Sequence, residues 1–278
     1  MSTAAAPTLA LINGARIPRL GLGTWPMDDA TAERVVASAI EVGYRLFDTA
    51  ENYGNERGVG RGLRTSGVAR EDVFVTTKFN KQWHSVDGAR RACEASLERL
   101  GLDYLDLLLI HWPNPAQDRY VEAFGGLVAL LRDGLVRAIG TSNFTPAHLQ
   151  RVLDETGVTP DVNQLQLNPY VVQEKGRAFA AERGIVVQSW SPLGRGPELR
   201  SEPVVVELAQ RIRRTPAQIL LRWHIELGLV PVPKSEDPQR LRENIAVFDF
   251  ALTTEDVARL AALDRGDEHV LDPESFGH

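Results

Sequence analysis

Cysteine and lysine are both scarce in this chain of 278 residues. Cys93 is the only cysteine, so no disulfide can form within the chain and no cysteine cluster can hold a metal ion. We interpret Cys93 as a small buried residue of a helix. Arginine supplies most of the 31 basic residues, and the only lysines are Lys78, Lys81, Lys175 and Lys234. Because lysine is a compact donor whose pKa shifts readily, each lysine in an arginine-rich chain is a candidate for a specific role.

A basic excess and long apolar runs are absent as well. The formal net charge is -6 and the pI is near 5.6, whereas a nucleic-acid partner requires positive charge to offset its phosphates. No stretch approaches about 18 consecutive apolar residues, and residues 1–8 have neither the basic start nor the apolar run of a signal peptide. We therefore expect a cytoplasmic, monomeric protein that binds a small molecule and neither nucleic acid nor a membrane.

The remaining composition is that of a globular enzyme-sized chain. Hydrophobic residues make up 43% and charged residues 24%, which is ordinary for a folded protein. No linker or low-complexity stretch interrupts the sequence, and its length lies within the range of α/β barrels. We expect residues 1–278 to form a single domain.

Strand-like and helix-like segments alternate along the chain. Asn13-Gly14 between two apolar segments predicts a short N-terminal hairpin with a tight two-residue turn. Apolar runs that predict strands follow at 20–23, 44–48, 73–77, 105–110, 136–140, 162–165, 185–189 and 229–232. The segments between them have helical spacing. Gly43 and Gly157 fit the C-terminal caps of two helices, and the starts of three others are marked by Thr145-Pro146, Thr215-Pro216 and Asp237-Pro238.

Eight such units predict a (β/α)8 TIM barrel, an α/β fold, with the short N-terminal β-hairpin before it. Parallel strands need right-handed crossovers, and eight of them most simply close into a barrel. The rival is an open doubly wound sheet that binds a dinucleotide. Its Gly-x-Gly-x-x-Gly fingerprint after a strand is missing, since Gly58, Gly60 and Gly62 lie inside a helical pattern.

Polar residues follow three consecutive apolar runs, where a barrel of this class has its active site. Asp48 ends the second run and Tyr53 follows it, Lys78 ends the third, and His111 ends the fourth. Taken singly, such residues have ordinary structural explanations: a helix cap for the aspartate, packing for the tyrosine and a satisfied structural role for the histidine. Their coincidence at one rim favours a shared function.

The four side chains suit hydride transfer to a carbonyl group. The carbonyl oxygen gains negative charge as hydride arrives, so it needs a proton donor, and Tyr53 can serve. A phenol has a pKa of about 10, and a nearby cation such as Lys78 makes proton transfer reversible nearer to neutral pH. Asp48 would keep that ammonium charged, and His111 would orient the carbonyl oxygen. A metal site is not expected, because the six histidines show no His-Glu-x-x-His spacing.

A second cluster opens the helix after the eighth predicted strand. Lys234 and Ser235 precede this helix, and Arg240 and Asn244 share a face of it with Glu243 beside them. A helix N-terminus flanked by basic side chains can bind an anion such as a ribose 2′-phosphate. A solvated surface is the equally weighted alternative.

These motifs resemble the aldo-keto reductase superfamily, over a stretch from the Asn13-Gly14 hairpin to the last helices. Asp48-Thr-Ala-Glu-Asn-Tyr53-Gly-Asn-Glu56 is similar to a family signature, and Thr76-Thr-Lys78, Ile110-His-Trp-Pro113 and Gly140-Thr-Ser-Asn-Phe144 follow in the family's order. The similarity is greatest to the bacterial branch of 2,5-diketo-D-gluconate reductases. One departure concerns the substrate pocket: relatives often have an aromatic residue two positions after the lysine, whereas Asn80 stands here, with Trp83 as a possible replacement.

The resemblance implies an NADPH-dependent reductase of aldehydes, ketones or keto-sugars, with Asp48, Tyr53, Lys78 and His111 as catalytic residues. It implies that Ser142, Asn143 and Gln164 hold the nicotinamide carboxamide, that Trp190 stacks on its ring, and that Ser191, Leu193 and Gly194 line the pyrophosphate. It further assigns the 2′-phosphate to Lys234, Ser235 and Arg240, the adenine to Glu243 and Asn244, and an apolar substrate slot to Trp25 and Trp112 beside His111.

Two other functions remain open at this point. One is an NADP(H)-binding regulatory barrel with negligible turnover, since a fold does not fix a function. The other is a Schiff-base lyase or isomerase that uses Lys78, although an ammonium paired with Asp48 is a poor nucleophile.

Overall fold

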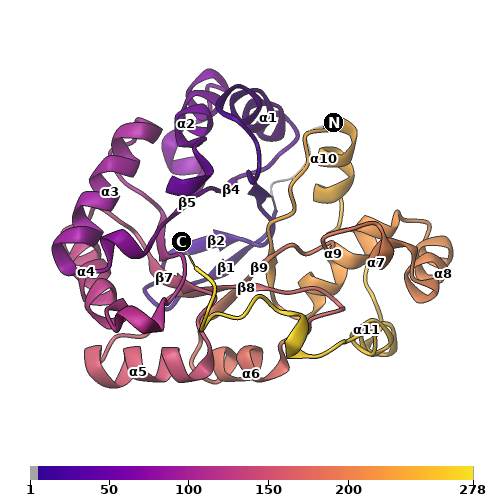
Figure 1. Ribbon diagram of the computed structural model, residues 1–278. Coiled ribbons are helices and arrows are strands. Elements are labelled where there is room, and N and C mark those ends of the chain that lie inside the picture. The colour runs from indigo at the N-terminus through magenta and orange to yellow at the C-terminus, as the bar shows by residue number, and fades with distance from the viewer. Residues whose placement is uncertain (1–5, 278) are drawn as a thin grey trace.

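The N-terminal hairpin is present, but its turn is wider than predicted. The computed structural model describes residues 6–277 (Figure 1). β1 (Thr8–Ala10) pairs antiparallel with β2 (Arg16–Pro18). Leu11 N donates to Ala15 O at 2.8 Å, so three residues form the loop, and its last residue, Gly14, has φ +89°. The prediction of a two-residue turn was wrong because Asn13 binds elsewhere: its side chain and backbone amide both donate to Asp161, directly before β8, the sixth strand of the barrel.

The predicted barrel strands are all found within the described residues. They form one eight-stranded parallel sheet in chain order: β3 (Leu22–Gly23), β4 (Leu46–Asp48), β5 (Phe74–Phe79), β6 (Leu107–Ile110), β7 (Ile139–Ser142), β8 (Val162–Gln166), β9 (Val186–Trp190) and β10 (Val230–Pro231). Gly21 N donates to Pro231 O at 3.0 Å and Gly23 N to Pro233 O at 3.1 Å. These bonds join the first and last strands, and the sheet closes into a (β/α)8 barrel.

Helices surround the sheet (Figure 1). Their bounds are α1 (Asp29–Glu41), α2 (Glu56–Thr65), α3 (Val86–Leu100), α4 (Tyr120–Arg132), α5 (Pro146–Thr156), α6 (Glu174–Glu182), α7 (Glu198–Ser201), α8 (Pro203–Ile212), α9 (Pro216–Glu226), α10 (Pro238–Ile245) and α11 (Thr254–Ala261). The side chains of Thr145, Thr215 and Asp237 cap α5, α9 and α10 as predicted, and Gly157 ends α5 at φ +68°. Across residues 6–277, every helix falls short of the length and hydrophobicity that a membrane crossing requires.

The glycines of α2 serve helix packing. A Cβ atom on Gly58 would overlap the backbone of Asp29, and one on Gly60 would overlap the carbonyl of Leu100. Only glycine lets α2 approach α1 and the end of α3 this closely. The prediction that these glycines belong to a helix rather than a phosphate-binding loop is confirmed.

Apolar side chains fill the barrel interior, and the hairpin closes one end of it. Leu11 and Ile17 of the hairpin segment pack in one buried cluster with Leu46, Phe74 and Leu107 of the strands. Cys93 is buried in α3, as expected for a structural residue. Since the hairpin covers the amino ends of the strands, a ligand can enter the barrel only at the carboxyl ends.

Candidate active site

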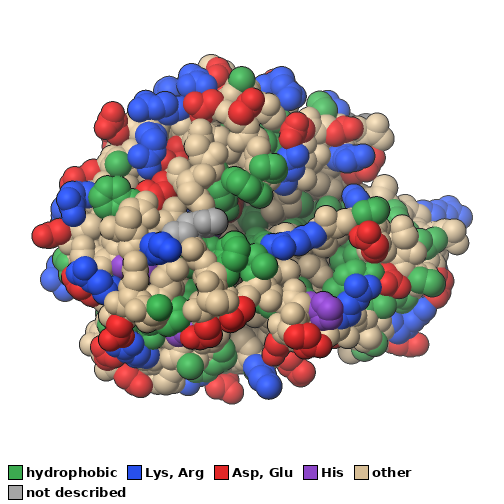
Figure 2. Space-filling view, viewed as in Figure 1, with side chains coloured by type: hydrophobic (Ala, Val, Ile, Leu, Met, Phe, Trp, Pro, Cys, Tyr) green, Lys and Arg blue, Asp and Glu red, His purple; other side chains and the backbone are tan. Residues whose placement is uncertain are grey.

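A deep pocket opens at the carboxyl ends of the strands. Its volume is about 780 Å³, and it is lined by Gly23 of β3, Asp48 of β4, His111 after β6, Ser142 of β7, Gln164 of β8 and Trp190 of β9. Figure 2 shows the hollow near the centre of this face, with hydrophobic side chains along its border. Trp25, Trp112 and Tyr53 are among the lining residues, and Trp25 remains 57% exposed. The pocket is therefore large enough for an extended ligand and joins most of the predicted site residues.

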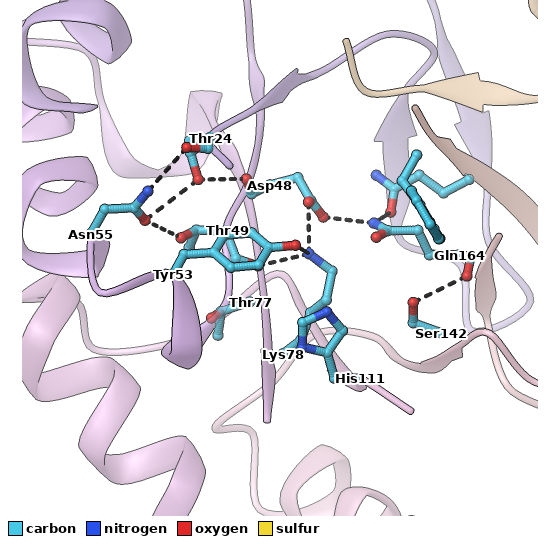
Figure 3. Close-up of polar contacts among 12 residues, drawn as sticks. Thr24, Asp48, Thr49, Tyr53, Asn55, Thr77, Lys78, His111, Ser142 and Gln164 are labelled. Carbon is cyan, nitrogen blue, oxygen red and sulfur yellow. Dashed lines mark hydrogen bonds and ion pairs between the residues drawn. The ribbon is translucent and has the colours of Figure 1, made fainter. Parts of the chain in front are cut away.

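Three of the four predicted catalytic side chains meet at the base of this pocket (Figure 3). The Lys78 ammonium donates to Asp48 Oδ1 at 2.7 Å, to the Thr49 carbonyl at 2.9 Å and to the Tyr53 hydroxyl at 3.3 Å. Lys78 is completely buried, and its three N–H donors are all directed at these protein oxygens. The phenol and the amine point toward each other, as proton transfer through Tyr53 requires.

The strand register explains why these residues meet. Asp48 at the end of β4 pairs with Thr76 of β5, and Lys78 lies two residues further along β5 on the same face. Tyr53 lies on a single 3-10 turn, η1 (Glu51–Tyr53), after β4. Asn55 secures this loop: its side chain donates to the carbonyls of Thr24 and Met27 and accepts from Thr49 at 2.7 Å.

Burial and charge act in opposite directions on the two proton-carrying groups. Burial tends to lower the pKa of Lys78, but the Asp48 carboxylate and the Tyr53 hydroxyl outweigh it, and the pKa of Lys78 is raised. Burial also raises the pKa of Tyr53, and the Lys78 ammonium offsets only part of that rise, so the net shift is away from neutral pH and not toward it as expected from the sequence. The ammonium therefore stays charged, and the phenol stays protonated at neutral pH.

His111 completes the group from the other side of Tyr53. The two rings lie edge to face with centroids 5.8 Å apart. His111 Nδ1 lies 3.0 Å from Asn80 Oδ1, and its backbone carbonyl accepts from Asn143 Nδ2 at 3.1 Å. The histidine is thus held on two sides while it lines the pocket.

Gln164 connects the catalytic group to the next part of the pocket. Its Nε2 donates to Asp48 Oδ2 at 2.7 Å and to Gln188 Oε1 at 2.6 Å. Ser142 Oγ donates to the Gln164 carbonyl, and Asn143 Oδ1 accepts from the Trp190 indole at 2.9 Å. These four predicted cofactor residues form one continuous network with Asp48.

The cluster after β10 is only partly joined to the pocket. Lys234 of this cluster lines the pocket, but Ser235, Arg240, Glu243 and Asn244 do not. The lining also includes the predicted pyrophosphate residues that follow β9, which are Ser191, Leu193 and Gly194. Lys234 pairs with Glu236 at 2.6 Å. Arg240 is exposed at the start of α10, and the Asp237 carboxylate already accepts from the Gln239 and Arg240 amides at that helix end.

Comparison with known proteins identifies the family. The model of the aldo/keto reductase family matches residues 19–265. The chain belongs to this family. A methylglyoxal reductase DkgA of Yersinia pestis is 46% identical over 273 residues, which cover 98% of each chain. An aldo/keto reductase of Brucella melitensis has a crystal structure that superposes with a TM-score of 0.90 at 42% identity, over 94% of this chain and all of that one.

A second solved structure bears on the ligand of the pocket. A mutant of Gox0644, crystallised in complex with NADPH, superposes with a TM-score of 0.93 at 40% identity, covering 98% of this chain and 99% of that chain. The resemblance stated from the motifs is therefore confirmed, including the branch of DkgA.

Sequence reasoning missed several residues of this aldo/keto reductase pocket. Arg195 and Arg200 line it, as do Leu271 and Phe276 from the C-terminal segment that crosses the barrel face in Figure 1. Phe276 packs against Trp112 with ring centroids 4.8 Å apart. Arg195 directly follows the predicted pyrophosphate residue Gly194, but no local motif marks Arg200, Leu271 or Phe276. Trp83 does not replace the missing aromatic residue, because it lies outside the lining and its indole donates to Glu51.

Proposed function

We propose that this protein reduces aldehydes, ketones or keto-sugars to alcohols with NADPH. The observation that carries the proposal is the Tyr53 hydroxyl, 3.3 Å from a buried Lys78 ammonium at the base of the pocket. Membership of the aldo/keto reductase family and the NADPH complex of a relative 40% identical in sequence support it. DkgA relatives carry the name methylglyoxal reductase, so small dicarbonyls belong to the candidate substrates.

The side chains of the pocket fit a nicotinamide dinucleotide. Ser142, Asn143 and Gln164 present a hydroxyl and two amides that suit the carboxamide, and the Trp190 indole offers a flat surface for the ring. Ser191, Leu193 and Gly194 would line the pyrophosphate, with Arg195 and Arg200 as nearby cations. Lys234, Ser235 and Arg240 would hold the 2′-phosphate, with Glu243 and Asn244 near adenine.

Bound NADPH would supply a hydride to the carbonyl carbon. Tyr53 donates its hydroxyl proton to the carbonyl oxygen, and its raised pKa keeps that proton available at neutral pH. Lys78 stabilises the phenolate that remains, and Asp48 holds Lys78 in place. His111 orients the substrate by hydrogen bonding, while Trp25 and Trp112 form the walls of its slot.

The other two functions have less support. A Schiff base on Lys78 requires a neutral amine, yet Asp48 and Tyr53 raise the pKa of this lysine and occupy its donors. A regulatory barrel without turnover would not require the complete set of Asp48, Tyr53, Lys78 and His111. Neither function explains the contact between phenol and amine.

The test is NADPH oxidation in the presence of a carbonyl panel that includes methylglyoxal, propanal and glyceraldehyde. We expect turnover with at least one of them, and a loss of roughly 100- to 10,000-fold in kcat for Tyr53→Phe with NADPH affinity retained. Consumption of NADPH at the uncatalysed rate with every carbonyl would refute the proposal. Equal rates for the wild type and Tyr53→Phe would refute the assignment of Tyr53.

We also propose that residues 1–278 act as a single-domain monomer in the cytoplasm. Among residues 6–277, no helix is long and apolar enough to cross a membrane. Light scattering at micromolar concentration should give the mass of one 30.7 kDa chain, and unfolding should follow one cooperative transition. A dimer mass or two separate transitions would contradict it.

A further inference from the structure

Asn80, the residue that follows Phe79 at the end of β5, lies beside His111. It is 3% exposed, and it does not line the pocket. Its side-chain oxygen lies 3.0 Å from Nδ1 of His111. The contact comes from the side-chain amide of Asn80, a group that no aromatic side chain carries.

Glu51 determines which way the Asn80 amide faces. Its Oε1 accepts from the Asn80 backbone N at 2.9 Å, from Asn80 Nδ2 at 3.0 Å and from Gln82 Nε2 at 2.8 Å. Its Oε2 accepts from the Trp83 indole at 2.8 Å. An ionised carboxylate can only accept hydrogen bonds, so the Asn80 atom that faces Glu51 must be the NH2 group. The atom that faces His111 must then be the amide oxygen.

The amide oxygen in turn determines where His111 carries its proton. An amide oxygen only accepts, so the Nδ1 of His111 must be the protonated nitrogen of this bond. In a neutral imidazole the opposite nitrogen, Nε2, then has a lone pair and accepts hydrogen bonds. Because Nδ1 is directed at Asn80, Nε2 is the ring nitrogen directed toward the pocket that His111 lines.

We propose that Asn80, clamped by Glu51, is a positioning residue that keeps neutral His111 in its Nδ1–H form, and that the pocket therefore prefers carbonyl substrates with a hydroxyl group beside the carbonyl. The preference rests on the proposed reductase function. Tyr53 supplies the donor to the carbonyl oxygen, so an acceptor at His111 is complementary to a neighbouring hydroxyl and not to the carbonyl itself. A hydroxyl-bearing aldehyde such as glyceraldehyde satisfies both groups, whereas propanal satisfies only Tyr53.

The tautomer can be measured without any substrate. Long-range proton–nitrogen NMR on the uniformly 15N-labelled protein, at a pH of about 8.5 where imidazoles are neutral, distinguishes the two forms. The His111 signals are assigned by their loss in His111→Gln. We expect a protonated Nδ1 and an unprotonated Nε2 in the wild type, and growth of the Nε2–H form in Asn80→Leu. An Nε2–H ring in the wild type would overturn the proposal, and this measurement stands even if Asn80→Leu fails to fold.

The substrate preference is tested by the ratio of kcat/KM for glyceraldehyde to that for propanal. We expect the wild type to favour glyceraldehyde, and Asn80→Leu to reduce the ratio by roughly two- to tenfold, the effect of one hydrogen bond. Gln82→Ala is the matched control, because it removes an exposed donor to the same Glu51 oxygen and leaves Asn80 in place. Equal losses on both aldehydes would overturn the preference.

The two measurements separate this proposal from the proposed function. A wild-type protein that reduces no carbonyl but has the Nδ1–H ring would refute the reductase function and leave the tautomer assignment intact. A protein that reduces both aldehydes with an Nε2–H ring would refute the role of Asn80 alone.

Discussion

The base of the pocket and its outer edge hold their charges in opposite ways. At the base, the Lys78 ammonium is completely buried and bonded to Asp48, Thr49 and Tyr53. At the edge, Lys234 is exposed and paired with Glu236 on its own loop, and Arg240 lies in solvent at the start of α10. The base is already arranged for chemistry, whereas the edge has cations whose partners a ligand must replace.

This difference separates positions where geometry is fixed by folding from positions where it depends on binding. A buried charge without partners is costly, so Lys78 and Asp48 can exist only as a bonded pair. Exposed ion pairs contribute little to stability, because water solvates each charge when the pair separates, so such charges can exchange partners. Substitutions at the base should therefore affect stability as well as rate, and those at the edge should affect cofactor affinity alone.

The largest expected effect belongs to Lys78→Met, which keeps the length of the side chain and removes its charge. Asp48 would then remain buried with Gln164 as its principal donor. We expect a loss of about 3 to 5 kcal/mol in the free energy of unfolding, measured by urea denaturation, together with loss of reductase activity.

The matched control is the double variant Asp48→Asn with Lys78→Met. It removes both charges, so it should recover much of the lost stability and none of the activity. An unchanged urea midpoint in Lys78→Met would mean that the base of the pocket is as tolerant as its edge.

The reaction direction should respond strongly to pH. Burial raises the pKa of Tyr53, so the phenol is protonated at neutral pH and serves the reduction directly. Alcohol oxidation needs the phenolate, whose fraction rises about tenfold per pH unit below the pKa. Between about pH 7 and about pH 9 we expect the oxidation rate with NADP+ to rise steeply, while the reduction rate shows no loss from this group. An oxidation rate that is level over this interval would show that Tyr53 is not the group that gains the proton.

Much of the fold could be predicted because its signals are local. Strands ended by polar residues and caps such as Thr145-Pro146 depend on near neighbours, and the strands lie within a few residues of their predicted bounds. The hairpin turn was missed for a long-range reason: Asn13 binds Asp161, 148 positions away. The conformation of a turn that packs against the barrel cannot be predicted from the identity of its two central residues alone.

The site divides in the same manner. Asp48, Tyr53, Lys78 and His111 each follow an apolar run, so strand order and register brought them to one rim. Arg195 directly follows the predicted pyrophosphate residue Gly194 and was overlooked there, whereas Phe276 and Arg200 lie on segments without a strand end or motif, and only the path of the chain brings them to the pocket. The function of Asn80 also could not be inferred, because it depends on the four donors that converge on Glu51.

At the outer edge, Arg240→Ala tests the 2′-phosphate assignment. We expect the Kd for NADPH to rise about tenfold or more, since a charge-assisted bond to phosphate is lost, and the Kd for NADH to stay unchanged. Arg242→Ala is the matched control, because it removes the same charge from the same helix at another exposed position. Equal losses for both cofactors in Arg240→Ala would remove the assignment.

The smallest effect on NADPH affinity is expected for a substitution at Glu236, which should tighten binding where Arg240→Ala weakens it. This carboxylate lies 2.6 Å from Lys234, with both side chains more than a third exposed. If Lys234 must leave Glu236 to reach a phosphate, then Glu236→Gln removes a competing anion, and NADPH should bind about two- to fivefold more tightly with NADH unaffected. Fluorescence titration with both cofactors measures this, and Glu255→Gln, an exposed carboxylate in the first turn of α11, is the control for net charge. Weaker NADPH binding in Glu236→Gln would mean that Glu236 holds Lys234 in its binding position, so that the edge is arranged in advance in the same manner as the base.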